Sequence, residues 1–100
     1  MNLLYTNAAS GVPVIERKGT DLGYGEVATS LARDVVTLAE RSSIENATEA
    51  HDLRHGIAAA LKACDHEQVG IDIIKAEDLL RDMSYSIAWA SDGGYRIYQS

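Results

Sequence analysis

Apolar residues recur at intervals of three and four along the middle of the chain, which is the spacing of one face of an α-helix. The first such repeat predicts a helix over residues 24–41. The second repeat predicts a helix that reaches Cys64, with the thiol on its apolar stripe as a small core residue. Gly56 lies inside this second helix, where glycine costs about 1 kcal/mol relative to alanine. We therefore expect Gly56 to mark a close approach of another helix.

The third repeat follows a break around residues 65–72, with Gly70 as the expected hinge. Apolar residues at helical spacing then run from Ile73 to Ala90 and predict a third helix. The competing interpretation is a strand over residues 85–89, in which large side chains alternate with small ones. Six helical positions against three strand positions favour the helix.

The two ends of the chain have the alternation of β-strands. Residues 2–6 and 12–17 predict an N-terminal hairpin, and residues 95–98 predict a final strand. The sequence therefore predicts one domain, residues 1–100, of the α+β class. Its expected architecture is three antiparallel helices and a small three-stranded antiparallel sheet, formed by the N-terminal hairpin and the C-terminal strand.

The charge changes what kind of partner is expected. The chain has 15 acidic residues against 9 Lys and Arg, a formal net charge of -6. Direct binding of nucleic acid through its phosphates calls for a basic balance and is therefore not expected. The chain also lacks a secretion signal and an apolar stretch long enough to span a bilayer, so we expect a cytoplasmic protein with no membrane partner.

Residues with catalytic potential do not form a complete set. His51 and His55 are four residues apart, as in zinc sites on helices, but point away from the apolar stripe and lack a third ligand. The next histidine, His66, would lie roughly 16 Å from His55 along a helix. We therefore expect no catalytic residue, no metal and no cofactor. A small metal-dependent hydrolase that uses His51 and His55 stays as a minor alternative.

Aromatic and acidic residues gather toward the C-terminus. Residues 65–82 contain six acidic residues against Lys75 and Arg81, a local net charge of -4. A second acidic cluster occupies residues 40–52, and the sequence leaves open whether the two clusters share a face. If residues 85–90 are helical, Tyr85 and Trp89 share its second face, either covered by the sheet or exposed as a binding hot spot. The candidate partner-binding residues are Tyr85, Trp89, Tyr95, Tyr98, Asp65, Glu67, Asp72, Glu77, Asp78 and Asp82.

These features favour a binding protein over an enzyme. The expected function is a small acidic inhibitor, of the kind that includes phage-encoded anti-CRISPR proteins, which blocks a basic nucleic-acid-binding protein by occlusion or charge mimicry. The alternative is an interaction protein of the antitoxin or immunity type, or a homo-oligomer with the aromatic residues in a twofold interface. This likeness is one of size, charge and composition only.

Overall fold

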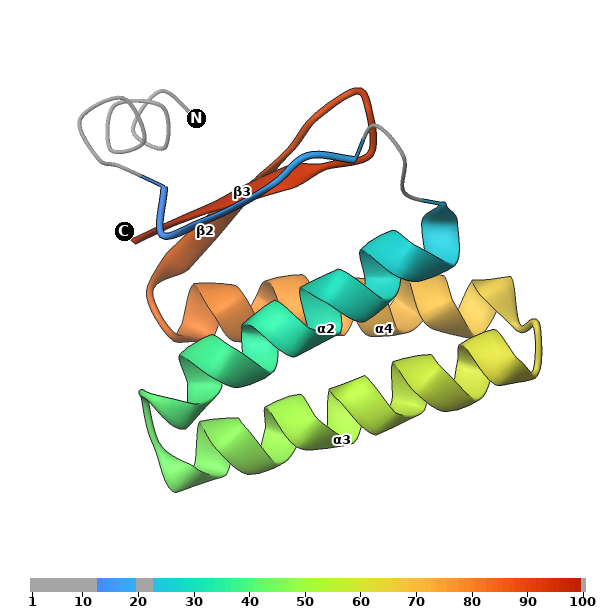
Figure 1. Cartoon of the computed structure of the whole chain (residues 1–100). Coiled ribbons are helices and arrows are strands. Elements are labelled where there is room, and N and C mark those ends of the chain that lie inside the picture. Colours follow the sequence, from blue (N-terminus) through green and yellow to red (C-terminus); the bar gives the residue numbers. More distant parts are fainter. Residues whose placement is uncertain (1–12, 20–22, 100) are drawn as a thin grey trace.

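The computed structural model describes residues 13–19 and 23–99 of the 100-residue chain. Its elements are β1 (Ile15–Arg17), α2 (Tyr24–Glu40), α3 (Ile44–Lys62), α4 (His66–Asp82), β2 (Tyr85–Trp89) and β3 (Tyr95–Gln99) (Figure 1). Three helices and a three-stranded antiparallel sheet confirm the predicted α+β class. The expected strand over residues 2–6 lies outside the described residues.

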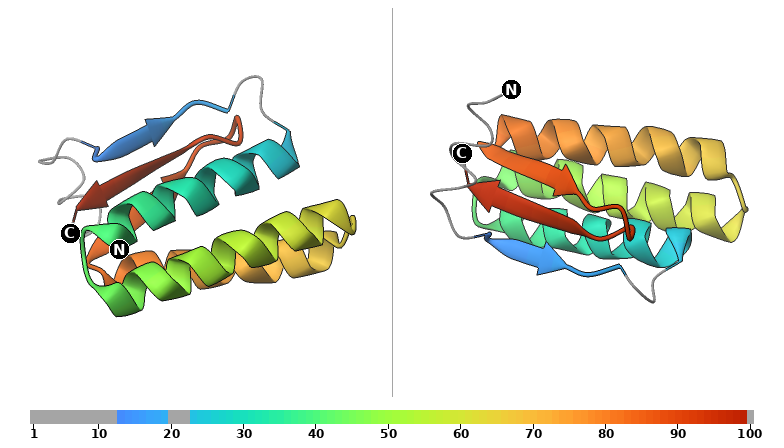
Figure 2. Two further views of the ribbon diagram at one scale, coloured as in Figure 1. Left: turned by 60° about the horizontal axis from the view of Figure 1, so that its bottom comes forward. Right: turned by 90° about the horizontal axis from the view of Figure 1, so that it is seen from above.

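The sheet lies across α2 and α4, and α3 packs against the opposite side of these two helices (Figures 1 and 2). The strand order is β1-β3-β2, so that the last strand in sequence is central. Successive helices run antiparallel, as expected, because the connections over residues 41–43 and 63–65 are too short for a parallel return.

The core fills the space between the helices and the inner face of the sheet. The largest fully buried side chains in the described residues are Tyr95, Leu31, Leu38, Ile57, Leu79, Leu80, Ile97, Val35 and Val69. The first helical repeat thus predicted the buried face of α2 correctly from Ala28 to Leu38, whereas Tyr24, the first residue of that face, is exposed. The expected close approach at Gly56 is also confirmed, because a Cβ there would lie 3.1 Å from Asp72 Oδ2 on α4.

The prediction of a helix from Ile73 to Ala90 is wrong at its end. Helix α4 stops at Asp82, and Ser84 takes a left-handed conformation with φ of 70° that turns the chain back. The next five residues form β2, in which Ile87 lies opposite Ile97. The helical spacing does continue past Asp82 in the sequence, but the strand interpretation prevails because β3 supplies a pairing partner and the sheet needs an inner apolar face.

The prediction of a buried Cys64 and of a hinge at Gly70 is also wrong. Helix α3 ends at Lys62, and Cys64 is exposed with φ of 57°, just past the helix C-cap. The Asp65 side chain then accepts a hydrogen bond from the Gln68 N–H and caps α4. The break is therefore shorter and earlier than expected, and Gly70 lies within a regular helix.

Candidate functional site

An acidic groove runs between α3 and α4. It has a volume of about 380 Å³ and is lined by Glu49, Asp52, Leu53, Asp72, Lys75 and Asp78. Two residues of the acidic cluster at 40–52 thus face two residues of the cluster at 65–82. The sequence left open whether the two acidic clusters share a face. Four of their carboxylates do, because antiparallel packing of α3 on α4 places them on one side of the molecule.

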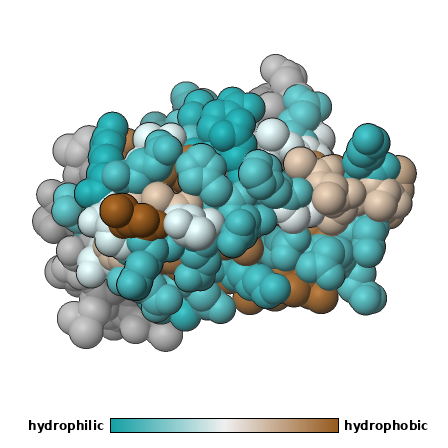
Figure 3. Space-filling model, turned by 90° about the horizontal axis from the view of Figure 1, so that it is seen from below, coloured by the Kyte–Doolittle hydropathy of each residue, from teal (hydrophilic) through white to brown (hydrophobic). Residues whose placement is uncertain are grey.

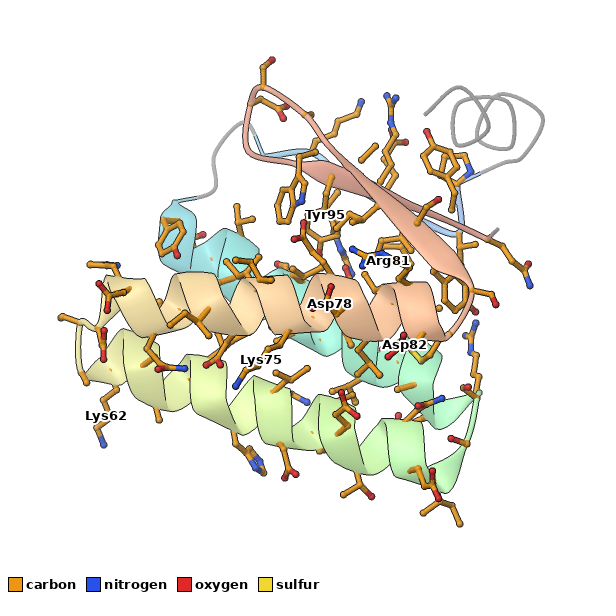
Figure 4. The ribbon with its side chains drawn as sticks, turned by 180° about the vertical axis from the view of Figure 1, so that it is seen from behind. Lys62, Lys75, Asp78, Arg81, Asp82 and Tyr95 are labelled. Carbon is orange, nitrogen blue, oxygen red and sulfur yellow. The ribbon has the colours of Figure 1, made fainter. Side chains whose placement is uncertain are left out.

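The groove has a buried acidic floor and charged walls. Asp72 is only 5% exposed, and its Oδ1 accepts a hydrogen bond of 3.0 Å from Gln68 Nε2. Space for this carboxylate exists because Gly56 has no side chain on the facing helix. Lys75 lies on the side of α4 toward α3 and is the single cation in the lining (Figure 4). Four carboxylates and one ammonium give this lining a formal charge of -3.

The other predicted acidic residues lie away from the groove. Asp65 caps α4, Glu67 and Asp82 are exposed at its two ends, and Glu77 Oε2 accepts a hydrogen bond of 2.5 Å from Trp89 Nε1. Asp78 belongs to the groove and also forms an exposed ion pair of 3.1 Å with Arg81. The stretch of residues 65–82 is therefore spread around α4 rather than gathered on one surface.

The four aromatic candidates do not form one exposed cluster. Tyr95 is fully buried, so its predicted role as a contact for a partner does not fit the fold, whereas the buried Asp72 reaches solvent only at the floor of the groove. Tyr85 and Tyr98 are partly buried. Trp89 keeps 41% of its surface exposed and stacks edge-on against Tyr95, with ring centroids 5.4 Å apart. Strand pairing places these rings on two different faces of the sheet.

A buried polar network joins the sheet to α2, and sequence reasoning missed it. Asp34 is 3% exposed and accepts two hydrogen bonds from Arg17, of 3.0 Å from Nε and 2.8 Å from Nη2. The Tyr95 hydroxyl donates a third bond of 2.6 Å to Asp34 Oδ2. The available signal was the position of Asp34, three residues after Leu31 and four before Leu38, on the apolar face of the first predicted helix.

We expect this network to make the stability of the protein depend on pH in the alkaline range, through Tyr95. Burial, and then the hydrogen bond to Asp34, raise the pKa of Tyr95 above its ordinary value of about 10. Since the folded-state pKa exceeds that of the unfolded chain, the contribution of Tyr95 to stability is complete below about pH 10 and is lost as the pH rises above it. We expect the free energy of unfolding to fall above that pH by up to about 1.4 kcal/mol per pH unit from this group.

Urea denaturation at a series of pH values measures this loss. Tyr95→Phe is the comparison, because phenylalanine keeps the ring and has no proton to lose. The difference in unfolding free energy between the two proteins should be constant below about pH 10 and shrink above it. A constant difference up to pH 11.5 would contradict the assignment.

Among the residues that the structure describes, His51 and His55 are not arranged with further ligands as the histidines of a metal site are. His51 Nε2 lies 3.2 Å from Glu40 Oε2, which connects α3 to the end of α2, and His55 is exposed. Within residues 13–19 and 23–99, no group of three His, Cys, Asp or Glu side chains is arranged to hold a metal ion. Across the same residues, no helix has the length and apolar character needed to cross a membrane.

Comparison with known proteins adds no relative. No family model matches the chain, and neither a curated protein nor a solved structure is significantly similar to it.

Proposed function

We propose that the chain is a protein-binding module whose acidic α3–α4 groove binds lysine and arginine side chains on a basic, nucleic-acid-binding partner. The observation that carries the proposal is the convergence of Glu49, Asp52, Asp72 and Asp78 on one groove. A surface with several fixed carboxylates attracts a basic partner at long range and disfavours acidic ones. The excess charge of the whole chain, -6, acts in the same direction.

The geometry supports occlusion of a basic surface. The exposed carboxylates of Glu49, Asp52 and Asp78 come from two antiparallel helices. Asp72 is held at the floor by its hydrogen bond from Gln68, so that carboxylates occupy spaced positions along the groove. The α3 side of the molecule is mostly hydrophilic, with apolar colour in separate spots (Figure 3). Such a face suits a polar contact that competes with a phosphate backbone. By this mechanism the protein acts as an inhibitor, and phage-encoded anti-CRISPR proteins are one class with this profile.

The experiment compares two doubly neutralised variants. Glu49→Gln with Asp52→Asn removes two groove carboxylates, and Glu26→Gln with Glu45→Gln removes the same charge from exposed positions elsewhere. The probe is a fluorescent peptide rich in lysine and arginine, titrated at low and physiological salt. We expect the groove variant to bind at least about tenfold more weakly, and the control variant to bind nearly as the wild type does.

The same variants then test the class of partner. Immobilised wild type and variants are used to capture proteins from a nuclease-treated lysate of the cells that carry the gene. The proposal expects captured nucleic-acid-binding proteins that elute as the salt concentration rises, and their loss from the groove variant alone. Equal capture by the groove and control variants would exclude the groove as the binding site. Affinity that stays flat with salt would exclude the electrostatic mechanism.

A further inference from the structure

Within residues 13–19 and 23–99, strand β2 lies at an edge of the sheet and has no strand on its outer side. The strand order β1-β3-β2 leaves β2 with one neighbour, β3. The carbonyl of Ile97 accepts a hydrogen bond of 2.7 Å from the Val14 N–H, so the hydrogen-bonding groups of Ile97 point toward β1 and away from β2. Ile87 lies directly opposite Ile97, and its own N–H and C=O must therefore point away from β3.

The turn after β2 gives the same alternation. Ala90 donates to the Gly94 carbonyl over 2.8 Å, so residues of even number in this strand bond to β3. The backbone groups of Tyr85, Ile87 and Trp89 consequently face outward along the free edge. No other described residue forms a backbone hydrogen bond with these outward-facing groups.

In the part of the chain that the structure describes, this edge has none of the features that usually protect a sheet edge. Sheet edges are commonly shielded by charged residues, proline, glycine bulges or a covering element. The sequence of β2 is Tyr-Ser-Ile-Ala-Trp, without charge, proline or glycine. Its inward side chains are also incompletely covered, since Trp89 is 41% exposed and Tyr85 and Ile87 are only partly buried. A further strand would satisfy the backbone groups and cover these side chains.

Helix α4 lies beside this edge, and the face of α4 that carries Ile74 and Arg81 is called the shelf. Seen from above the sheet, α4 lies to the outside of β2 (Figure 2), so anything paired with β2 rests over α4. Arg81 lies on the side of α4 next to the sheet (Figure 4). Ile74 is seven residues earlier, two helical turns along nearly the same line, and is 58% exposed. The shelf therefore offers an apolar contact near Trp89 and charged groups toward Tyr85.

We propose that the free edge of β2 binds an extended segment of a partner protein by β-strand addition, a site separate from the acidic groove. Side chains of the segment opposite Tyr85, Ile87 and Trp89 would point inward over the shelf, which calls for alternating apolar residues. The intervening residues would point to the outer face of the sheet, beside Ser86 and Ala88, so polar residues such as lysine suit these positions. A second copy of this chain is the competing occupant, but its own α4 also projects beyond β2, so two helices would have to share the space beside the paired edges (Figure 2).

The first experiment uses a set of short synthetic peptides in which valine or isoleucine alternates with lysine. Amide hydrogen exchange in the isotope-labelled protein is measured by NMR with and without peptide. We expect the amides of Tyr85, Ile87 and Trp89 to exchange rapidly in the free protein and at least about tenfold more slowly with peptide. Ser86 and Ala88, which bond to β3, should be protected in both states. Absence of added protection with every peptide would overturn the proposal.

Two controls separate strand addition from other contacts. Peptides N-methylated at alternate residues cannot pair with the edge and should not protect it, and equal binding by these peptides would refute main-chain pairing. Ile74→Lys should weaken peptide binding about tenfold by removing apolar contact from the shelf, while Ile44→Lys, at an exposed site on α3, should not. Edge protection that rises with protein concentration in the absence of peptide, together with a dimer in sedimentation, would assign the edge to a second copy and overturn the proposal.

Discussion

Replacement of Asp34 by alanine is expected to lower the free energy of unfolding by about 3 kcal/mol. The buried Tyr95 hydroxyl would lose its acceptor, and an unsatisfied buried group costs about 1–3 kcal/mol. The ion pair with Arg17 would be lost as well, but the Arg17 side chain is 44% exposed and solvent replaces part of that interaction. Urea denaturation with a constant m-value measures the change.

The outer face of the sheet supplies the matched control. Arg96 and Glu16 pair at 2.6 Å across β3 and β1, and both are largely exposed. Arg96→Met should leave the free energy of unfolding essentially unchanged, because a solvated ion pair of this kind contributes little. Arg17→Met should fall between this control and Asp34→Ala. Equal effects of Asp34→Ala and Arg96→Met would mean that the network is not what holds the sheet on α2.

Replacement of Gly94 by alanine is the second change with a large expected effect. An added Cβ would meet the Arg17 carbonyl oxygen and would lie 2.7 Å from the Gly19 nitrogen. Both contacts are with backbone, so β1 would have to move away from the start of β3 instead of a side chain turning aside. We expect a loss of about 3 kcal/mol, at the upper end of the usual cost of overpacking. Thermal or urea denaturation measures it.

Gly70→Ala is the control for this substitution and should have the opposite sign. A Cβ at Gly70 would lie 3.8 Å from the Tyr24 hydroxyl, an ordinary contact, and the site is inside α4. Alanine there should stabilise the protein by about 1 kcal/mol through helix propensity. A destabilising effect of Gly70→Ala would contradict the uninterrupted helix described here.

The amino-acid pattern was a good guide wherever one face of an element is buried. The 3.6-residue repeat placed α2 within a residue or so of its ends, because Leu31, Val35 and Leu38 pack against one continuous core. Gly56 was correctly interpreted as a close approach, since a glycine within a helix carries a local cost that packing must offset.

The errors occurred where local and long-range interactions compete. Residues 85–89 fit a helix face as well as a strand, and pairing with β3, which is six residues away along the chain, decides for the strand. Cys64 matched the apolar stripe of α3 but lies just beyond its last turn, since Cys64 and Asp65 make the turn that starts α4. Counting apolar positions along the chain detects neither the pairing with β3 nor the turn at Cys64 and Asp65.

The sequence by itself determined the fold class, the three helices and the acidic character of the chain, because these depend on periodicity and composition. The tertiary structure alone decided that Glu49 and Asp52 face Asp72 and Asp78, and that Asp34 meets Arg17 and Tyr95. It also decided that β2 lies at the edge of the sheet formed by the described strands. The physical reason is that each of these depends on which faces of separate elements meet. That choice is made by packing between residues far apart in the chain, whereas the pattern within an element reports only which of its faces is buried.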